Sequence, residues 1–309
     1  MIPRAEDQRP VVVVAIGGNA LLRRGEPPDI AHQRHALVGT AQALVPLASE
    51  HRLVITHGNG PQVGVLAMQA EALPELGALP LDVLDAESMG LVGYLITEAL
   101  TTAEPELAVA AVLTRVTVDP DDPAFADPTK PIGPVLSERE ASRRERDHGW
   151  RFVAEGGGRR RVVASPAPRR ILELAAIRRL VDGGIVTIAA GGGGIPVVER
   201  AGGGWSGVEA VIDKDRTSAR LAVELDADRL VILTDVDGVY ADWGTSSARR
   251  IDRISLSDTA AIATDRGGMG PKLLAASQFV RETGRDAVIG ALSDADAVLS
   301  GTAGTTVVM

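Results

Sequence analysis

The 309-residue chain contains no cysteine, which excludes disulfide bonds, a thiolate nucleophile and any metal site built on cysteine. Aromatic residues make up only 3% of the chain, so it offers few surfaces on which single-stranded bases could stack. A net charge of -9 argues against general binding to nucleic acid. The segment Met1 to Pro10 is polar and lacks the apolar core of a signal peptide. We therefore expect a cytoplasmic protein that acts on small molecules and binds neither nucleic acid nor a membrane.

Lysine is also scarce. Of 32 lysine and arginine residues only three are lysines, Lys130, Lys214 and Lys272, and each lies in a junction rich in glycine, proline or aspartate. Arginine is a wide planar fork, whereas lysine carries a compact ammonium on a flexible stem that can follow a moving oxygen. An arginine-rich composition that keeps lysine only where arginine cannot replace it favours phosphoryl transfer. The alternative is that the three lysines are chance survivors of a biased composition.

Short β-branched runs alternate with amphipathic stretches along most of the chain. This pattern predicts an α/β fold in which a mainly parallel central sheet lies between helices. The expected strands are Val11 to Ile16, Arg52 to Thr56, Val109 to Val118, Gly184 to Ala190, Arg229 to Thr234, Ala287 to Ala291 and Thr305 to Met309. The expected helices are Ala31 to Ser49, Pro61 to Leu73, Leu84 to Leu100, Arg169 to Val181, Thr217 to Leu225 and Pro271 to Thr283.

The alternation breaks between about residues 119 and 168, where proline, aspartate and arginine accumulate. A structureless loop of that length is rare inside a compact domain, so we expect an inserted subdomain. It should contain a short helix near Ser137 to Asp147 and a hairpin around Gly156 to Gly158. The run Arg159 to Arg161 is expected to form a solvated strand face. The insertion carries Lys130.

Glycine clusters follow three of the expected strands. They are Gly17-Gly18-Asn19, His57-Gly58-Asn59-Gly60-Pro61 and Gly191 to Gly194. Open α/β sheets bind ligands beyond the carboxyl ends of their strands, where glycines let backbone N–H groups approach an anion. A single glycine pair is commonly just a tight connection, but three clusters favour an anion site. No lysine follows a glycine, so a P-loop is excluded, and Val63 and Pro196 break the dinucleotide-binding spacing.

The second half of the chain adds charged residues at expected helix starts. Asp213-Lys214-Asp215 precedes one helix, where the aspartates suit either capping or the holding of an ammonium. Thr234 to Tyr240 follows a strand and, taken alone, is typical of a turn. Gly267 to Lys272 opens another helix with Pro271 in its favoured first turn. Lys272 is thereby expected beside a helix N-terminus, which also attracts anions.

Together these motifs resemble the amino acid kinase superfamily and, within it, the carbamate kinase family. The resemblance rests on Gly17 to Asn19, His57 to Gly64, Pro128 to Pro134, Gly191 to Val198, Gly207 to Asp215, Thr234 to Val239 and Met269 to Lys272, and it covers nearly the whole chain. Two positions depart from the family pattern. Met89 stands where many members carry glutamine, and Gly267-Gly268 replaces a commoner Pro-Gly-Ser sequence before Met269.

The resemblance implies two lobes. Residues 1–206 would bind carbamate and the phosphoryl group, residues 207–309 would bind ATP or ADP, and a protruding subdomain at about 119–168 would bring Lys130 over the site. Many relatives, such as N-acetylglutamate kinases, carry a lysine in the first glycine turn, where this chain has Asn19. That difference favours carbamate over an acylated amino acid. The resemblance also implies a homodimer and Mg²⁺ bound with the nucleotide, without a metal site of the protein's own.

The roles that follow from the resemblance fall into three groups. The expected catalytic residues are Lys130, Lys214, Lys272 and Asp215. The expected substrate-binding residues are Gly17, Gly18, Asn19, Gly58, Asn59, Gly60, Gly192 and Gly193. The expected nucleotide-binding residues are Asp213, Asp235, Val236, Tyr240, Met269 and Pro271.

The implied reaction is reversible phosphoryl transfer between ATP and carbamate, giving ADP and carbamoyl phosphate. Carbamate is already an anion, so no strong general base is needed, and His57 is expected to be structural. Lysines, Mg²⁺ and glycine-turn amides would stabilise the charge on the transferring group. Two alternatives stay open: another acid kinase of the superfamily, of the N-acetylglutamate kinase type, and a catalytically silent nucleotide-binding regulator.

Overall fold

The apolar runs of the sequence form the central sheet, and β1 (Val11–Ile16) is buried along its whole length. The computed structural model describes residues 8–23, 25–72, 79–262 and 268–309. In spatial order the eight-stranded sheet runs β15 (Arg253–Ser255), β17 (Thr305–Val308), β16 (Ala287–Ala291), β12 (Arg229–Thr234), β1, β2 (Arg52–His57), β9 (Val186–Ile188) and β3 (Val109–Ala111). All neighbours are parallel except β16 and β17. This is the mainly parallel α/β fold that the sequence predicts.

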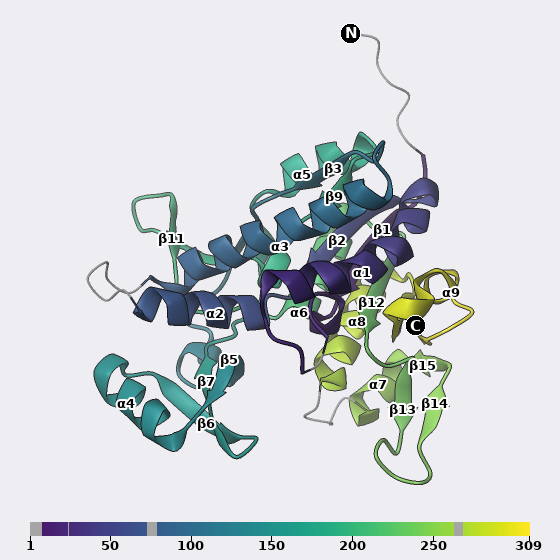
Figure 1. Ribbon diagram of the computed structural model, residues 1–309. Coiled ribbons are helices and arrows are strands. Elements are labelled where there is room, and N and C mark those ends of the chain that lie inside the picture. Colours follow the sequence, from purple (N-terminus) through teal and green to yellow (C-terminus); the bar gives the residue numbers. More distant parts are fainter. Residues whose placement is uncertain (1–7, 24, 73–78, 263–267) are drawn as a thin grey trace.

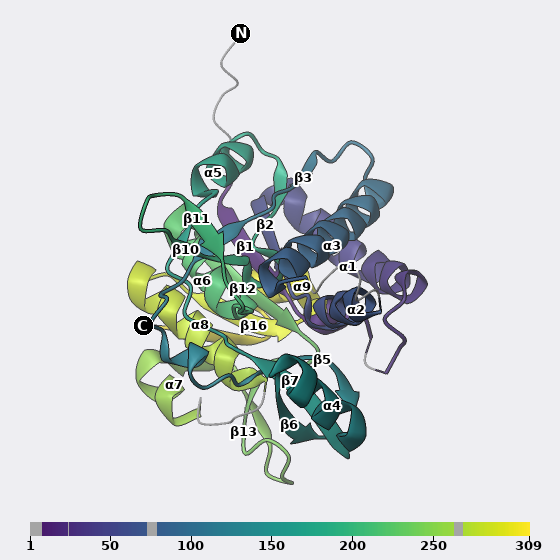
Figure 2. The same cartoon turned by 90° about the vertical axis from the view of Figure 1, so that its left-hand side faces the viewer.

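Helices cover both faces of this sheet (Figures 1 and 2). One face packs against α1 (Ile30–Glu50), α3 (Leu81–Ala103) and α9 (Ala295–Ser300). The other packs against α5 (Leu174–Asp182), α6 (Lys214–Leu225) and α8 (Met269–Thr283), while α7 (Leu256–Ile262) contacts α8 and β15. Alternate residues of β1 serve the two cores, since Val13 joins the α6 side and Val14 the α1 side. A strand buried on both faces explains the unbroken apolar run in the sequence.

Smaller units stand at the margins of the central sheet. A second sheet has the order β11 (Trp205–Gly207), β10 (Ile195–Glu199), β4 (Arg115–Thr117) and β8 (Arg170–Ile171). A two-stranded ribbon joins β13 (Val239–Ala241) and β14 (Arg249–Ile251). Short 3₁₀ turns cover Gly18–Ala20, Pro123–Phe125, Gly191–Gly193 and Leu292–Asp294.

The inserted region contains a three-stranded sheet, β5 (Lys130–Leu136), β7 (Gly158–Val163) and β6 (Arg151–Glu155), with α4 (Glu138–His148) against it. It projects from the body beneath α2 (Gly60–Glu71) in both views (Figures 1 and 2). Ser137 and Glu140 form a capping box that starts α4, as the local sequence suggests. The expected helix and hairpin are both present.

Three local predictions are wrong. The expected strand from Val109 to Val118 is split between two sheets, because the Thr114 hydroxyl donates to the carbonyl of Val112 and accepts from the amide of Ala190, so it bends the chain between β3 and β4. The expected helix from Arg169 begins only at Leu174, because the preceding residues pair with β4 as strand β8. The arginines of β7 are only partly exposed, and the guanidinium of Arg161 lies 3.5 Å from the centre of the Trp150 ring.

In the described part of the chain, no helix has both the length and the apolar character needed to cross a bilayer.

Two positions of α1 test the packing of this sheet. Leu44 is fully buried against the strands, whereas Gln42 on the same helix is exposed. We predict that Leu44→Ala lowers the free energy of unfolding by about 2–5 kcal/mol, because it leaves a cavity. Gln42→Ala is the control and should change it by no more than about 0.5 kcal/mol. Urea unfolding followed by circular dichroism measures both, and equal losses in the two variants would contradict the assigned packing.

Candidate functional site

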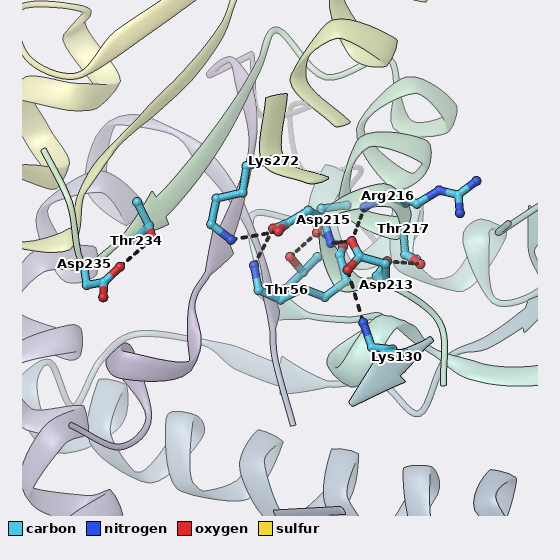
Figure 3. Close-up of polar contacts among 11 residues, drawn as sticks. Thr56, Lys130, Asp213, Asp215, Arg216, Thr217, Thr234, Asp235 and Lys272 are labelled. Atoms are coloured by element: carbon cyan, nitrogen blue, oxygen red, sulfur yellow. Dashed lines mark hydrogen bonds and ion pairs between the residues drawn. The ribbon is translucent and has the colours of Figure 1, made fainter. Parts of the chain in front are cut away.

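Two of the three lysines share one carboxylate. The side chain of Asp215 accepts from Lys214 Nζ at 2.5 Å through Oδ1 and from Lys272 Nζ at 2.9 Å through Oδ2. Lys214 and Asp215 form the first turn of α6, and Lys272 lies in the first turn of α8. Figure 3 shows Lys272 reaching across to Asp215 from a different element of the fold. The sequence thus predicted a cluster that the fold assembles from residues 57 positions apart.

This cluster is buried and carries surplus positive charge. The Asp215 side chain is 4% exposed, and the two lysine side chains are 12% and 13% exposed. Burial alone would raise the pKa of Asp215, but the neighbouring ammonium groups of Lys214 and Lys272 outweigh it and hold this pKa well below its usual range. One carboxylate therefore faces two ammonium groups. A second anion is needed to balance the site, which suits it to phosphate groups.

Asp213 joins the third lysine to the same helix. Its Oδ1 accepts from the backbone amides of Asp215 at 3.0 Å and Arg216 at 3.2 Å, which makes it the N-cap of α6. Its Oδ2 accepts from Lys130 Nζ at 3.1 Å. Lys130 comes from the projecting subdomain and approaches Asp213 on the side away from Lys272 (Figure 3). The family resemblance implies a nucleotide contact for Asp213, whereas in the structure its two oxygens accept from the backbone of α6 and from Lys130.

The glycine turns pack against this charged cluster. A Cβ on Gly58 would lie 3.6 Å from Cδ of Lys214, so the second turn lies beside that lysine. Gly192 and Gly193 have φ values of 67° and 100°, and a Cβ there would fall 2.2 Å from Nδ2 of Asn59 and 2.3 Å from the Ile212 carbonyl oxygen. Only glycine fits such positions. The turn that ends β9 is thereby held against the residues leading into α6.

Asn59 has partners that the sequence did not reveal. Its side-chain amide donates to Oδ1 of Asp85 at 3.0 Å and to Oγ of Ser88 at 2.8 Å, both on α3. Burial raises the pKa of Asp85 well above its ordinary value, although the hydrogen bond from Asn59 acts in the opposite direction. Asn59 is itself 3% exposed. Its side chain therefore fixes the turn to α3, and no local motif around Asp85 signals this contact.

A cleft of about 1210 Å³ opens beside Lys214 and Lys272. Its lining includes the first glycine turn, the end of β12, the β13 region and the start of α8. Of the expected residues, Gly17, Gly18, Asn19, Asp235, Val236, Tyr240 and Met269 line it, whereas Gly58, Asn59, Gly60, Gly192, Gly193, Asp213, Pro271 and Lys130 do not. The Asn19 amide donates to Oδ2 of Asp235 at 2.8 Å, which links two sides of the cleft.

Trp243 lines the same cleft and was missed by sequence reasoning. It is 61% exposed and its ring lies 5.1 Å from that of Tyr240 in an edge-on arrangement. The chain has only three tryptophans, and Trp243 closely follows the segment Thr234 to Tyr240, which was expected to bind a ligand. This position was the signal in the sequence that could have identified it. The pair offers an aromatic surface to a planar ligand group.

The two departures from the family pattern, at Met89 and at Gly267-Gly268, lie in different parts of the chain. Met89 is buried, and its sulfur accepts from the backbone amide of Thr114 at 3.3 Å, so it does not line the cleft. Gly267 lies outside the described residues, whereas Gly268 lines the cleft.

Within the described ranges there is no group of three or more His, Asp or Glu side chains placed to hold a metal ion. Beside the lysines, the carboxylates of Asp213 and Asp215 are already paired with ammonium groups, whereas the carboxylate of Asp235, which lines the cleft, accepts from Asn19. Mg²⁺ is usually bound through one or two carboxylates together with the phosphates of a ligand.

His57 is enclosed at the end of β2. Its Nδ1 is 2.8 Å from the carbonyl oxygen of Gly58, so Nδ1 carries the proton, and Nε2 is buried without a partner. Burial, reinforced by the charge of Lys214, lowers the pKa of His57 to about 4 even though the Gly58 contact acts against this shift. The residue is therefore neutral at physiological pH and bonded to its own turn, which suits a structural role.

The chain matches a sequence model described as the amino acid kinase family over residues 10–291. A carbamate kinase of Rhizobium meliloti is 47% identical over 297 residues, which cover 95% of this chain and 92% of that protein. A carbamate kinase of Escherichia coli strain K12 is 48% identical over 295 residues, covering 95% and 98% of the two chains. The solved structure of carbamate kinase from Giardia lamblia bound to AMP-PNP superposes with a TM-score of 0.89 at 35% identity, covering 97% and 99%.

The low pKa of His57 leads to a prediction about how the stability of the protein depends on pH. The pKa of His57 is about 4 in the folded chain and about 6.5 in an unfolded one. Between these values the unfolded state binds a proton that the folded state does not, so stability is present above about pH 6.5 and is lost as the pH falls. From pH 7 to pH 5 the loss due to His57 should be about 2 kcal/mol. Urea unfolding of wild type and of His57→Gln at both pH values measures this loss. If both proteins lost the same stability between pH 7 and pH 5, the prediction would be contradicted.

Proposed function

The chain belongs to the amino acid kinase family, and we propose that it transfers a phosphoryl group reversibly between ATP and carbamate, giving ADP and carbamoyl phosphate. The observation that carries this proposal is the convergence of Lys130, Lys214 and Lys272 on two carboxylates at the start of α6, beside a cleft of about 1210 Å³. High identity to carbamate kinases over nearly the whole chain supports the same reaction.

The lysines supply the charge that the reaction needs. Phosphoryl transfer spreads negative charge over the oxygens of the migrating group, and positioned cations stabilise it. Lys214 and Lys272 would contact that group and the nucleotide phosphates, and Asp215 would hold both ammonium groups in place. Lys130 would act from the opposite side, over the carbamate. Burial of the cluster strengthens each of these interactions because the effective dielectric constant is low.

No general base is required. The attacking oxygen of carbamate is already anionic and can approach the γ-phosphorus in line, so the site has to position it rather than deprotonate it. His57 is neutral, buried and bonded to the backbone, which supports its exclusion from proton transfer. In the reverse direction the β-phosphate oxygen of ADP attacks the phosphorus of carbamoyl phosphate. The same lysine ammonium groups would stabilise the transferring group in this direction.

The two substrates would occupy the two sides of the lysine cluster. We assign the nucleotide to the cleft beside α8, where Asp235, Val236, Tyr240 and Met269 lie. Carbamate would bind near the second and third glycine turns, between Lys214 and Lys130. This arrangement corresponds to a carbamate lobe at residues 1–206 and a nucleotide lobe at 207–309. Asn19, in a turn where related acid kinases carry lysine, adds support for the smaller acceptor.

A kinase that uses ATP works with a divalent cation, and we propose Mg²⁺. Bound to the phosphates, it would neutralise their charge and polarise the bond to the transferring group. Lys214 and Lys272 would share the remaining charge of those phosphates, and Asp235, which lines the cleft, is the carboxylate placed to help hold the cation.

We also propose that the enzyme is a cytoplasmic homodimer. Helices α1 and α3 carry Val38 and Tyr94, which are 54% and 55% exposed, and an ion pair between Arg34 and Glu98 joins the same two helices. Exposed apolar and aromatic side chains of this kind are suited to contact with a second copy. The complete lack of cysteine fits a reducing compartment.

A coupled assay tests the proposed reaction. We predict that the purified protein forms ATP from ADP and carbamoyl phosphate when Mg²⁺ is present, and that acetyl phosphate and N-acetylglutamyl phosphate serve poorly. Hexokinase and glucose-6-phosphate dehydrogenase report the ATP. Activity with N-acetylglutamyl phosphate alone would replace the proposal by a kinase for acylated amino acids, and nucleotide binding without any transfer would indicate a silent regulator.

Charge-conserving substitutions test the lysines. We predict that Lys214→Arg and Lys272→Arg each lower turnover by roughly 100-fold, because a planar guanidinium cannot take the position of one transition-state donor. Arg220→Lys, also on α6 but paired with Glu224 and Glu282, is the control and should keep its activity. Near-normal turnover in both lysine variants would contradict the roles given to these ammonium groups.

A further inference from the structure

The backbones of α2 and β5 come so close at Gly64 that no side chain fits between them. A Cβ on Gly64 would lie 2.1 Å from Cα of Gly133 and 2.7 Å from its backbone nitrogen. Unbonded carbon atoms stay about 3.5–4.0 Å apart. Any residue other than glycine at position 64 would therefore push the two backbones apart by more than about 1 Å.

The partner strand is shaped for this contact. Gly133 has a φ of 68°, and the pairing of β5 with β7 shifts register between Ile132 and Val135, so the strand bends where it meets α2. Lys130 lies three positions before Gly133 on the same strand. The contact that positions the backbone of β5 is thus one short segment away from the lysine.

One face of α2 carries the whole junction. Gly64, Ala67, Met68 and Glu71 recur at helical spacing and line a small hollow of about 30 Å³ against the subdomain. At the far end of that face, Glu71 forms an ion pair with Arg144 of α4 at 2.8 Å, with side chains 20% and 10% exposed. The subdomain thus contacts α2 at two points that lie about two helical turns apart.

The other end of α2 faces the charged cluster. The helix begins directly after the turn in which Gly58 packs against Lys214. Val63 of α2 is buried together with Ile132 of β5 and with Val211, which lies two residues before Asp213. Helix α2 thus contacts both the segment that holds Asp213 and the strand that carries Lys130. Its position therefore sets the distance between these two residues.

We propose that Gly64 is a positioning residue for Lys130. Its missing side chain sets how closely β5 lies against α2, and this distance places the Lys130 ammonium on Asp213 at 3.1 Å. A displacement of about 1 Å breaks that hydrogen bond, and a misplacement of this size can cost about 100-fold in rate. The part of this proposal that concerns rate rests on the proposed function, whereas the part that concerns geometry does not.

Labelling of lysine tests the geometry without any assay of activity. The chain has only three lysines, so a limiting amount of an amine-reactive ester followed by peptide mass spectrometry reports each one separately. In Gly64→Ala we expect Lys130 to react at least roughly threefold faster than in wild type, because it leaves Asp213. Lys214 and Lys272, which are held by Asp215, should keep their rates.

The matched control is Gly39→Ala. Gly39 lies in α1, is exposed, and a Cβ there meets nothing within 4 Å, so all three lysines should label as in wild type. Should Gly64→Ala fail to fold, Glu71→Gln loosens the second tie without adding bulk and should also raise labelling of Lys130. Unchanged labelling of Lys130 in a folded Gly64→Ala, or in Glu71→Gln where Gly64→Ala does not fold, would overturn the proposal.

A double-mutant cycle tests the consequence for rate. We expect Gly64→Ala to lower kcat by roughly 10- to 100-fold with little change in the KM for ADP. In a Lys130→Ala background the same substitution should cost less than about twofold, because the residue it positions is gone. If Gly64→Ala lowered kcat by the same factor in the Lys130→Ala background as in wild type, Gly64 would not act through Lys130 and the proposal would be overturned. If wild type itself lacks activity with carbamoyl phosphate, the proposed function fails. The labelling of Lys130 then decides by itself whether Gly64 positions that lysine.

Discussion

The structure depends on one buried carboxylate that holds two ammonium groups. Asp215 is 4% exposed and accepts from both Lys214 and Lys272, so the cluster keeps a surplus positive charge where water is scarce. A buried charge is costly unless it is paired, and here the pairing is complete only when an anion arrives. The same imbalance favours the binding of an anion, which suits the cluster to phosphate groups.

The rest of the fold serves to bring that cluster together. Asp215 and Lys214 lie at the N-terminus of α6 and Lys272 at the start of α8, and both helices cover the same face of the central sheet. The glycine turns after β1, β2 and β9 let backbone approach the same edge. The third lysine comes from a subdomain that α2 holds at Gly64 and Glu71. Chemistry at this site therefore depends on how accurately separate packing units meet.

Much of this was visible in the sequence where a signal is local. The strands Val11–Ile16, Arg229–Thr234 and Ala287–Ala291 follow from their unbroken apolar runs, and the scarcity of lysine pointed to Lys214 and Lys272. Contacts between distant segments were not visible. The bend that Thr114 imposes, the partnership of Asn59 with Asp85 and the backbone contact of Gly64 with Gly133 each depend on residues at least 25 positions away.

The most direct test of the central claim is a crystal structure of the protein with ADP, Mg²⁺ and aluminium fluoride, which imitates the phosphoryl group in transfer. The account predicts that Nζ of Lys214 and Nζ of Lys272 both lie within hydrogen-bond distance of the fluorides or the β-phosphate while still contacting Asp215. Lysine ammonium groups turned toward bulk solvent, with the analogue held by other residues, would contradict it.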